Sequence, residues 1–224
     1  FFIKAFKRKG KLIFSIPDWI PQLRQPTVQC DLSPPTYKEI CKIIKQLKGS
    51  CSPCPIDQVS IICFKRCPYL RSYIAAVCSN VLASQHIPSP WRRATTILLH
   101  KQGDTDDPAN FRPITLQPTT LKIFTSFSMR TFTFLVNNGY AESHMQKGFI
   151  PGLSGTFEHI ASMEFLINHA RKKQRSITIT LLDLKNAFGE VEHSLIASIL
   201  KYHHIPDQIS NVIRILHSYC SSDA

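Results

Sequence analysis

The side chains best suited to chemistry lie at the end of one apolar run. Residues 177–182 mix β-branched or apolar side chains with threonines, and the run ends at a carboxylate, Asp183. This alternation predicts a β-strand with one polar face. A carboxylate at the end of a buried strand is well placed to ligate a metal, and Ala187 and Phe188 just after it fit a nucleotide bound beside that metal. The alternative is that Asp183 is a turn residue or a helix N-cap.

Two cations flank a loop further upstream. Residues 94–100 and 111–116 read as strands, and the segment between them is rich in turn formers, so the sequence predicts a hairpin with a polar tip. Lys101 opens the loop and Arg112 follows its end. The point charge of a lysine and the fork of an arginine are suited to gripping a polyphosphate. The alternative is a pair of solvated charges beside the acidic residues of the loop.

A glycine-containing segment joins two of the predicted helices. Residues 146–152 include Gly148 and Gly152, which allow a ligand or a phosphate strand to approach the backbone closely. The alternative is a simple loop between helices. The site candidates therefore fall on three separate stretches of the chain.

The elements that must position these residues are mostly helices. Thr36 and Glu39 form a capping box that predicts a helix with Ile40 and Ile44 on its apolar face, ending near Gly49. The remaining helices are predicted over residues 70–84, 121–136, 156–171, 194–202 and 206–219. The order of helix, hairpin, helices, strand and helix predicts an α+β fold.

The charge of the chain favours a polyanionic partner. Lysine and arginine number 27 against 15 acidic residues, which gives a formal net charge of +12. Nucleic acid is the first candidate, and an anionic membrane, met by the basic and apolar residues 1–12, is the second. No run is long enough to span a bilayer, and no signal peptide is evident. We therefore predict no membrane partner and an intracellular protein, nuclear, cytoplasmic or both, that is not secreted.

Four of the eight cysteines have spacings that a zinc site uses. They are Cys51, Cys54, Cys63 and Cys67. The stretch between the two pairs is short for two zinc knuckles, and apolar residues surround Cys63, so reduced thiols in a core are favoured. No zinc is expected, and a zinc-stabilised interaction module stays open as an alternative.

A family resemblance rests on several segments in a fixed order. These are Ser52 to Asp57, Ile87-Pro88, Trp91-Arg92, Ile97 to Lys101, Asn110 to Leu116, Leu121 to Phe124, Gln146 to Phe149 and Leu182 to Phe188. Over about residues 35–220 the chain resembles the reverse transcriptases of non-long-terminal-repeat (LINE-type) retrotransposons. The resemblance implies an RNA-directed DNA polymerase with an RNA template, a DNA primer and dNTPs. It also implies a division into a basic lead-in (1–34), the fingers of a right-hand polymerase (35–175), and the first strand and helix of a truncated palm (176–224).

The resemblance also implies roles for the candidate residues. Asp183 would ligate two Mg²⁺ or Mn²⁺ ions, and the carbonyl of Leu184 would reach one of them. Ala187 would lie under the triphosphate, while Phe188 would crowd a ribose 2′-hydroxyl and so favour dNTPs. The triphosphate would be held by Lys101 and Arg112. The template and primer would pass along Gln146, Gly148, Pro151 and Gly152.

Two departures from the family pattern bear on activity. Gly189 stands where the family often has an aspartate, and no adjacent acidic pair follows residue 183. Because the family draws its second metal carboxylate from such a pair, this chain is expected to be inactive by itself. A non-catalytic nucleic-acid-binding remnant is the remaining alternative.

Overall fold

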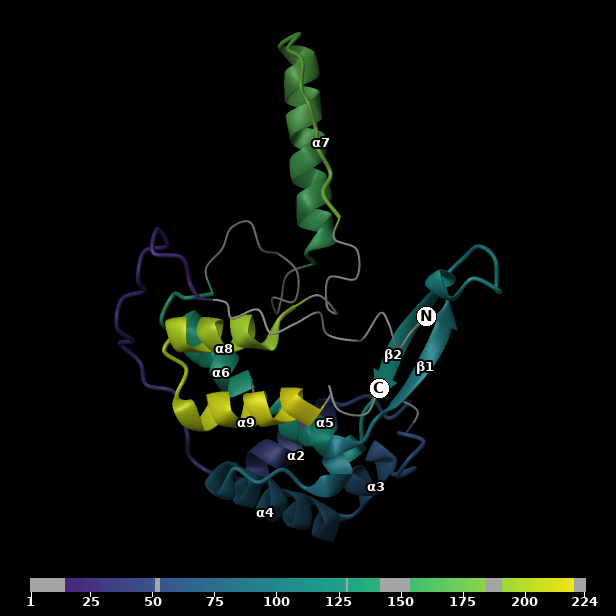
Figure 1. The fold of residues 1–224 in the computed structure, drawn as a ribbon, viewed down its shortest axis with the longest axis vertical. Helices are drawn as coiled ribbons and strands as arrows, with labels where there is room; N and C mark the ends of the chain where they lie inside the picture. The colour runs from purple at the N-terminus through teal and green to yellow at the C-terminus, as the bar shows by residue number, and fades with distance from the viewer. Residues whose placement is uncertain (1–14, 51–52, 128, 142–153, 184–190, 220–224) are drawn as a thin grey trace.

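The computed structural model describes residues 15–50, 53–127, 129–141, 154–183 and 191–219. The helices are α2 (Tyr37–Gln46), α3 (Ile61–Arg66), α4 (Pro68–Ser84), α5 (Thr119–Ser126), α6 (Met129–Asn137), α7 (Thr156–Lys172), α8 (His193–Tyr202) and α9 (Asp207–Tyr219). Two short 3₁₀ helices, η1 (Ser89–Arg92) and η2 (Pro108–Asn110), adjoin the hairpin of β1 (Thr95–His100) and β2 (Phe111–Leu116). This mixture is compatible with the predicted α+β class. Figure 1 shows the hairpin and α7 projecting in different directions from the body of helices.

The capping box predicted at the start of α2 is confirmed. The Thr36 hydroxyl accepts a hydrogen bond from the Glu39 N–H at 3.3 Å, and the Glu39 carboxylate accepts one from the Thr36 N–H at 2.9 Å. Ile40 and Ile44 are buried, as predicted. The helix ends at Gln46, before the predicted stop, because Leu47 already has an extended backbone.

A short helix that the sequence did not predict precedes α4. The side chain of Ser60 accepts a hydrogen bond from the Ile62 N–H and so caps α3. Cys67 separates the two helices, and Pro68 opens α4 in the first-turn position that proline tolerates. Six residues give too little periodicity for a sequence-based prediction.

The main hydrophobic core is built around α4. Its buried residues come from α2, α3, α4, α5, α9 and the segment through η1: Ile40, Ile44, Ile61, Phe64, Ile74, Cys78, Val81, Ile87, Trp91, Leu121, Ile123, Phe124 and Val212. A second, smaller cluster joins Cys30, Phe134 and Ile205. The main core joins α2, near the start of the chain, to α9, near its end. The second cluster attaches the segment around Cys30 to the same body.

The helix predicted over residues 121–136 is two helices. The helix is interrupted at Phe127. The Phe127 N–H donates to the Phe124 carbonyl, and the backbone N–H of Arg130 donates to the Phe127 carbonyl. The break allows Phe124 to pack in the main core while Phe134 packs in the second cluster. A continuous helix would not serve both clusters at once.

The predicted hairpin is confirmed with its full register. Thr95 pairs with Leu116 and His100 with Phe111 in six antiparallel pairs. At the tip, Gly103 has a φ of +93°, and a Cβ there would meet the Asn110 side chain at 2.8 Å. Glycine is therefore required at this position of the loop.

The strand predicted before Asp183 is wrong. Residues 176–183 form no strand and are exposed throughout, with Leu181 at 82% and Leu182 at 92% exposure. In the part of the chain that the structure describes, the two strands of the sheet pair with each other, so this segment has no strand to bond with. An alternating pattern forms a strand only where a partner edge is available. The predicted helix that follows is present as α8.

Candidate functional site

The hairpin brings Lys101 and Arg112 together on one face. Arg112 lies opposite Leu99 in the register, and the pairing continues by one step because the Lys101 N–H bonds the Asn110 carbonyl at 2.8 Å. Because side chains alternate along a strand, Lys101, Leu99 and Arg112 project from the same side. Diagonal neighbours of this kind lie about 7–8 Å apart. A single polyphosphate can therefore contact both cations.

The acidic residues of the loop do not neutralise these cations. The Asp104 carboxylate accepts a hydrogen bond from the backbone N–H two residues later at 2.9 Å, and Asp107 does the same at 2.9 Å. Within the described ranges, no ion pair joins either carboxylate to Lys101 or Arg112. Both cations are exposed, so they are open to an anionic ligand.

Asp183 comes from a different part of the fold than the two cations, the segment that follows α7. The residues after α7 turn back from its far end, where the Arg175 N–H bonds the Ala170 carbonyl at 2.9 Å. Figure 1 shows α7 projecting from the body of helices and this segment running back along it. Asp183 is exposed at the end of that segment. The other predicted site residues lie outside the described residues: Leu184, Ala187, Phe188, Gln146, Gly148, Pro151 and Gly152.

The candidate metal ligands are not gathered into one cluster in the described part of the chain. Among the described residues, no three histidine, cysteine or acidic side chains gather closely enough to hold a metal ion. The Asp183 carboxylate is a hard oxygen ligand of the kind that Mg²⁺ and Mn²⁺ prefer. Of the four cysteines of the zinc alternative, Cys54 is buried with its thiol 3.2 Å from the Leu116 carbonyl, and Cys63 is exposed. Cys51 lies outside the described residues.

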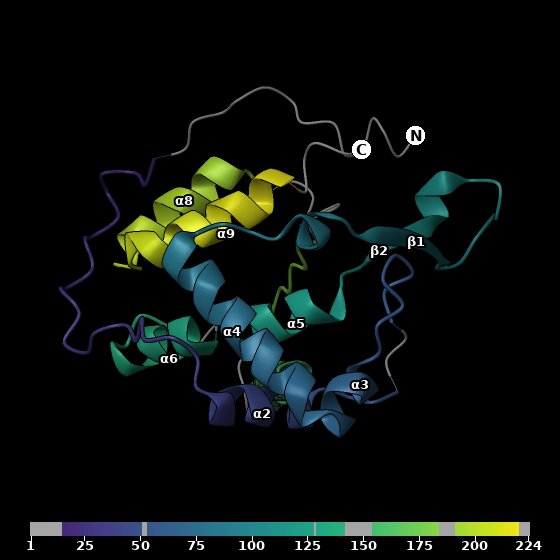
Figure 2. The ribbon, with the colours of Figure 1, turned by 90° about the horizontal axis from the view of Figure 1, so that it is seen from below.

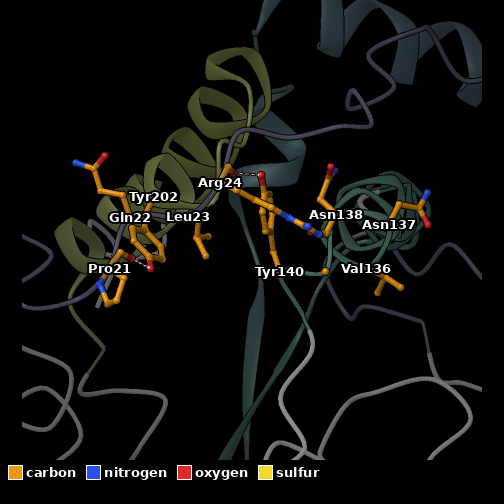
Figure 3. A pocket seen from close by; sticks show the side chains of 10 residues that line it. Pro21, Gln22, Leu23, Arg24, Val136, Asn137, Asn138, Tyr140 and Tyr202 are labelled. Carbon is orange, nitrogen blue, oxygen red and sulfur yellow. Dashed lines mark hydrogen bonds between the residues drawn. The ribbon is translucent and has the colours of Figure 1, made fainter.

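A separate cavity lies against the N-terminal segment. Figure 3 shows this cavity of about 610 Å³, with Tyr202 at one end and Val136 at the other. None of the predicted site residues lines it. The Tyr140 hydroxyl donates a hydrogen bond to the Arg24 carbonyl and the Tyr202 hydroxyl to the Pro21 carbonyl, both at 2.6 Å. These bonds fix one wall of the cavity to the end of α6 and to α8.

A single buried asparagine anchors that N-terminal segment. The Asn138 side-chain oxygen accepts from the Thr27 N–H at 2.7 Å and from the Val28 N–H at 3.0 Å. Its amide nitrogen donates to the carbonyls of Val28 and Phe134, both at 2.9 Å. The sequence did not predict this role, because the contacts join residues about 110 positions apart.

Arg130 forms a second anchor that the sequence did not predict. Its guanidinium pairs with Glu39 at 2.6 Å and with Asp31 at 2.9 Å, and donates to the Ser33 carbonyl at 2.7 Å. Hydrogen bonds from Ser33 and then the Arg130 charge hold the pKa of Asp31 below its usual value. Burial alone would raise the pKa of Glu39, but hydrogen bonds from Arg130 and the backbone outweigh it and lower this pKa. Arg130 therefore links α6 to the start of α2.

No helix among the described residues has both the length and the apolar character needed to cross a bilayer.

Comparisons with known proteins show that the chain is similar to proteins of mobile elements. No protein-family model matches it. It is 30% identical over 129 residues to a "Retrovirus-related Pol polyprotein from type-1 retrotransposable element R2" of Popillia japonica, covering 57% of this chain and 17% of that protein. A protein of the same description from Nasonia vitripennis is 28% identical over 144 residues, 62% of this chain and 13% of its own length. The "Probable RNA-directed DNA polymerase from transposon BS" of Drosophila melanogaster is 26% identical over 172 residues, 76% of this chain and 19% of its own length.

The chain thus spans about a fifth or less of the length of these relatives. Their descriptions confirm the resemblance predicted from the sequence.

Proposed function

Because several of its homologues are reverse transcriptases of LINE-type retrotransposons, we propose that this chain is part of an RNA-directed DNA polymerase. The polymerase would extend a DNA primer along an RNA template with dNTPs. The observation that carries the proposal is the hairpin, where Lys101 and Arg112 share one face and no loop carboxylate neutralises them. This is the arrangement that a triphosphate requires.

The proposed chemistry is nucleotidyl transfer. The primer 3′-hydroxyl attacks the α-phosphorus of the dNTP, the bond to the β-phosphate oxygen breaks, and pyrophosphate leaves. Lys101 and Arg112 would hold the β- and γ-phosphates and offset the charge that develops on the leaving group. Asp183 would hold Mg²⁺ or Mn²⁺, which activate the attacking hydroxyl and stabilise the leaving oxygen when bound. Asp183 comes from the segment after α7 and the two cations come from the hairpin, so the proposal requires the bound substrate to contact both.

Further roles follow from the family resemblance. The Leu184 carbonyl would reach one metal, Ala187 would lie under the triphosphate, and Phe188 would select against a ribose 2′-hydroxyl. Template and primer would contact Gln146, Gly148, Pro151 and Gly152. Residues 35–175 would form the fingers and the palm would begin at residue 176. The reaction would take place inside the cell, in the nucleus, the cytoplasm or both.

A manganese titration tests the metal role of Asp183. In the presence of dTTP and an RNA–DNA primer–template, we expect Asp183→Asn to weaken Mn²⁺ binding, followed by electron paramagnetic resonance, at least severalfold. Asp18→Asn is the matched control, because Asp18 is another exposed carboxylate without a recorded hydrogen bond among the described residues. Equal Mn²⁺ affinity in the two variants would remove Asp183 from the proposal.

Primer extension tests whether these 224 residues suffice by themselves. We expect no extension with Mg²⁺ and dNTPs, because the chain holds one candidate metal carboxylate of the family pattern and no adjacent acidic pair after it. Robust extension that Asp183→Ala abolishes would show that the residues present are enough.

A nucleic-acid-binding protein without catalysis is the second candidate, and the net charge of +12 favours it. Binding to RNA that falls steeply with salt, and that Lys101 and Arg112 substitutions leave unchanged, would support this candidate instead.

A further inference from the structure

The outward face of α2 carries a row of lysines. Lys38, Lys42 and Lys45 are four and three residues apart, so they follow one another along one side of the helix. All three are exposed. With a rise of 1.5 Å per residue they extend over about 10 Å. The opposite side of α2 packs Ile40 and Ile44 into the core, which fixes the direction of the row.

These lysines have no acidic partner among the described residues. The only acid in α2 is Glu39, and its carboxylate is held by Arg130 and Thr36. Lysines four apart repel each other, and Lys38 lies in the first turn, where the helix dipole disfavours a cation. Stability of the helix therefore does not explain the row.

The two neighbouring helices, α3 and α4, each add a cation to the row of lysines. The Lys65 ammonium of α3 donates to the Lys45 carbonyl at 3.4 Å, which places it at the end of the row. At the other end, Arg71 of α4 lies close enough to Tyr37 for its charge to act on the phenol. The Arg71 Nε is buried without a hydrogen-bond partner in the described chain, and Tyr37 is 45% exposed.

We call this surface the basic face, made of Lys38, Lys42, Lys45, Lys65, Arg71 and Tyr37. Figure 2 shows α2, α3 and the start of α4 together at one edge of the molecule, with the hairpin away from them. The basic face is thus separate from Lys101 and Arg112. In the described part of the chain, none of its five cations forms an ion pair with a carboxylate. Together with the exposed ring, these cations suit a chain of phosphates that also carries aromatic groups.

We propose that the basic face binds the backbone of single-stranded nucleic acid, with the Tyr37 ring against a base, outside the site that holds the nucleotide. A single strand fits better than a duplex, because its unpaired bases can stack on an exposed ring. An anionic membrane fits less well, because the buried Ile40 and Ile44 turn the apolar side of α2 away from the lysines. The proposal goes beyond the polymerase function and does not depend on it.

A salt titration of oligonucleotide binding tests the basic face. The probe is a fluorescent 20-nucleotide oligo(U), read by anisotropy without divalent metal or dNTP. Each phosphate contact on a single strand contributes about 0.7 to the slope of log K against log salt. Replacing Lys38, Lys42 and Lys45 together by glutamine is therefore expected to reduce that slope by about 2. Glutamine is a good helix former, so α2 is expected to survive.

The matched control replaces three exposed lysines elsewhere, Lys172, Lys173 and Lys201, by glutamine. This control removes the same net charge but is expected to leave most of the slope intact. Equal losses in the two triple variants would overturn the proposal, because net charge alone would then account for binding. A loss confined to phosphatidylserine vesicles, with oligo(U) binding unchanged, would overturn it as well.

Two further variants separate strand type and function. Tyr37→Leu is expected to weaken the binding of oligo(U) severalfold and to leave the binding of a 20-base-pair duplex unchanged. Weaker binding of the duplex with unchanged binding of oligo(U) would contradict a role of Tyr37 in stacking. Asp183→Asn is expected to leave the salt slope of oligo(U) binding unchanged. If the polymerase assignment fails, the result for the basic face therefore still holds. A slope that falls in Asp183→Asn would place the strand at the nucleotide site instead.

Discussion

At the scale of single residues, two polar side chains tie distant segments of the chain together: the buried Asn138 and the partly exposed Arg130. Asn138 joins the N-terminal segment to the end of α6, and Arg130 joins α6 to the start of α2. The Asn138 amide is itself buried, and its hydrogen bonds give it the partners that a buried polar group needs.

The first prediction concerns Asn138. Asn138→Ala leaves the Thr27 and Val28 N–H groups without their acceptor, and we expect it to lower the free energy of unfolding in urea by about 1–3 kcal/mol. The neighbouring Asn137 is exposed, and Asn137→Ala is expected to change the same quantity by no more than about 0.5 kcal/mol. Similar losses in the two variants would mean that the anchor is not formed.

The second prediction concerns pH. The pKa values of Asp31 and Glu39 are lowered in the folded chain, so the unfolded chain binds more protons as the pH falls. Their contribution to stability is present above their ordinary pKa values of about 4 and is lost as the pH falls through the lowered values. Urea unfolding between pH 2 and 6 is expected to show this loss. In Arg130→Met the loss is expected to be smaller, and an unchanged pH dependence would contradict the network.

At the scale of elements, local signals were predictable and long-range ones were not. The capping box of Thr36 and Glu39 acts within four residues, so the sequence alone predicted the start of α2. The hairpin was predictable for the same reason, because its loop is rich in turn formers. The break at Phe127 was not, since it depends on where two separate clusters lie. The candidate site was only partly predictable: turn formers predicted the hairpin that carries Lys101 and Arg112, but nothing local shows where Asp183 will lie.

The third prediction concerns residues 176–183, which form no strand here. Their amides are expected to exchange with deuterium within seconds, as in an unstructured peptide, while peptides from α4 stay protected. Hydrogen-exchange mass spectrometry measures both in one experiment. Protection of residues 176–183 equal to that of α4 would show that the segment is paired, contrary to this structure.

At the scale of the whole molecule, a core around α4 supports two separate positively charged regions. The fourth prediction tests that core through its thiols. Burial raises the pKa of Cys78 to about 12, whereas Cys63 is exposed. Iodoacetamide at pH 8 is expected to modify Cys63 first and Cys78 only as fast as the chain unfolds. Rapid modification of Cys78 under native conditions would contradict the packing of α4.

The two charged regions have different tasks in this account. The basic face on α2, α3 and α4 would hold a strand, and the hairpin would hold the nucleotide. The central claim is that Lys101 and Arg112 recognise the β- and γ-phosphates together.

Comparing dTTP with dTMP tests that claim most directly. Their dissociation constants are measured on a primer–template with Mg²⁺, for the wild type and for Lys101→Gln combined with Arg112→Gln. An Arg93→Gln and Lys173→Gln pair, both exposed, is the control. We predict that the wild type and the control bind dTTP more tightly than dTMP, and that the hairpin variant loses this preference. A preference for dTTP that persists in the hairpin variant would contradict the account.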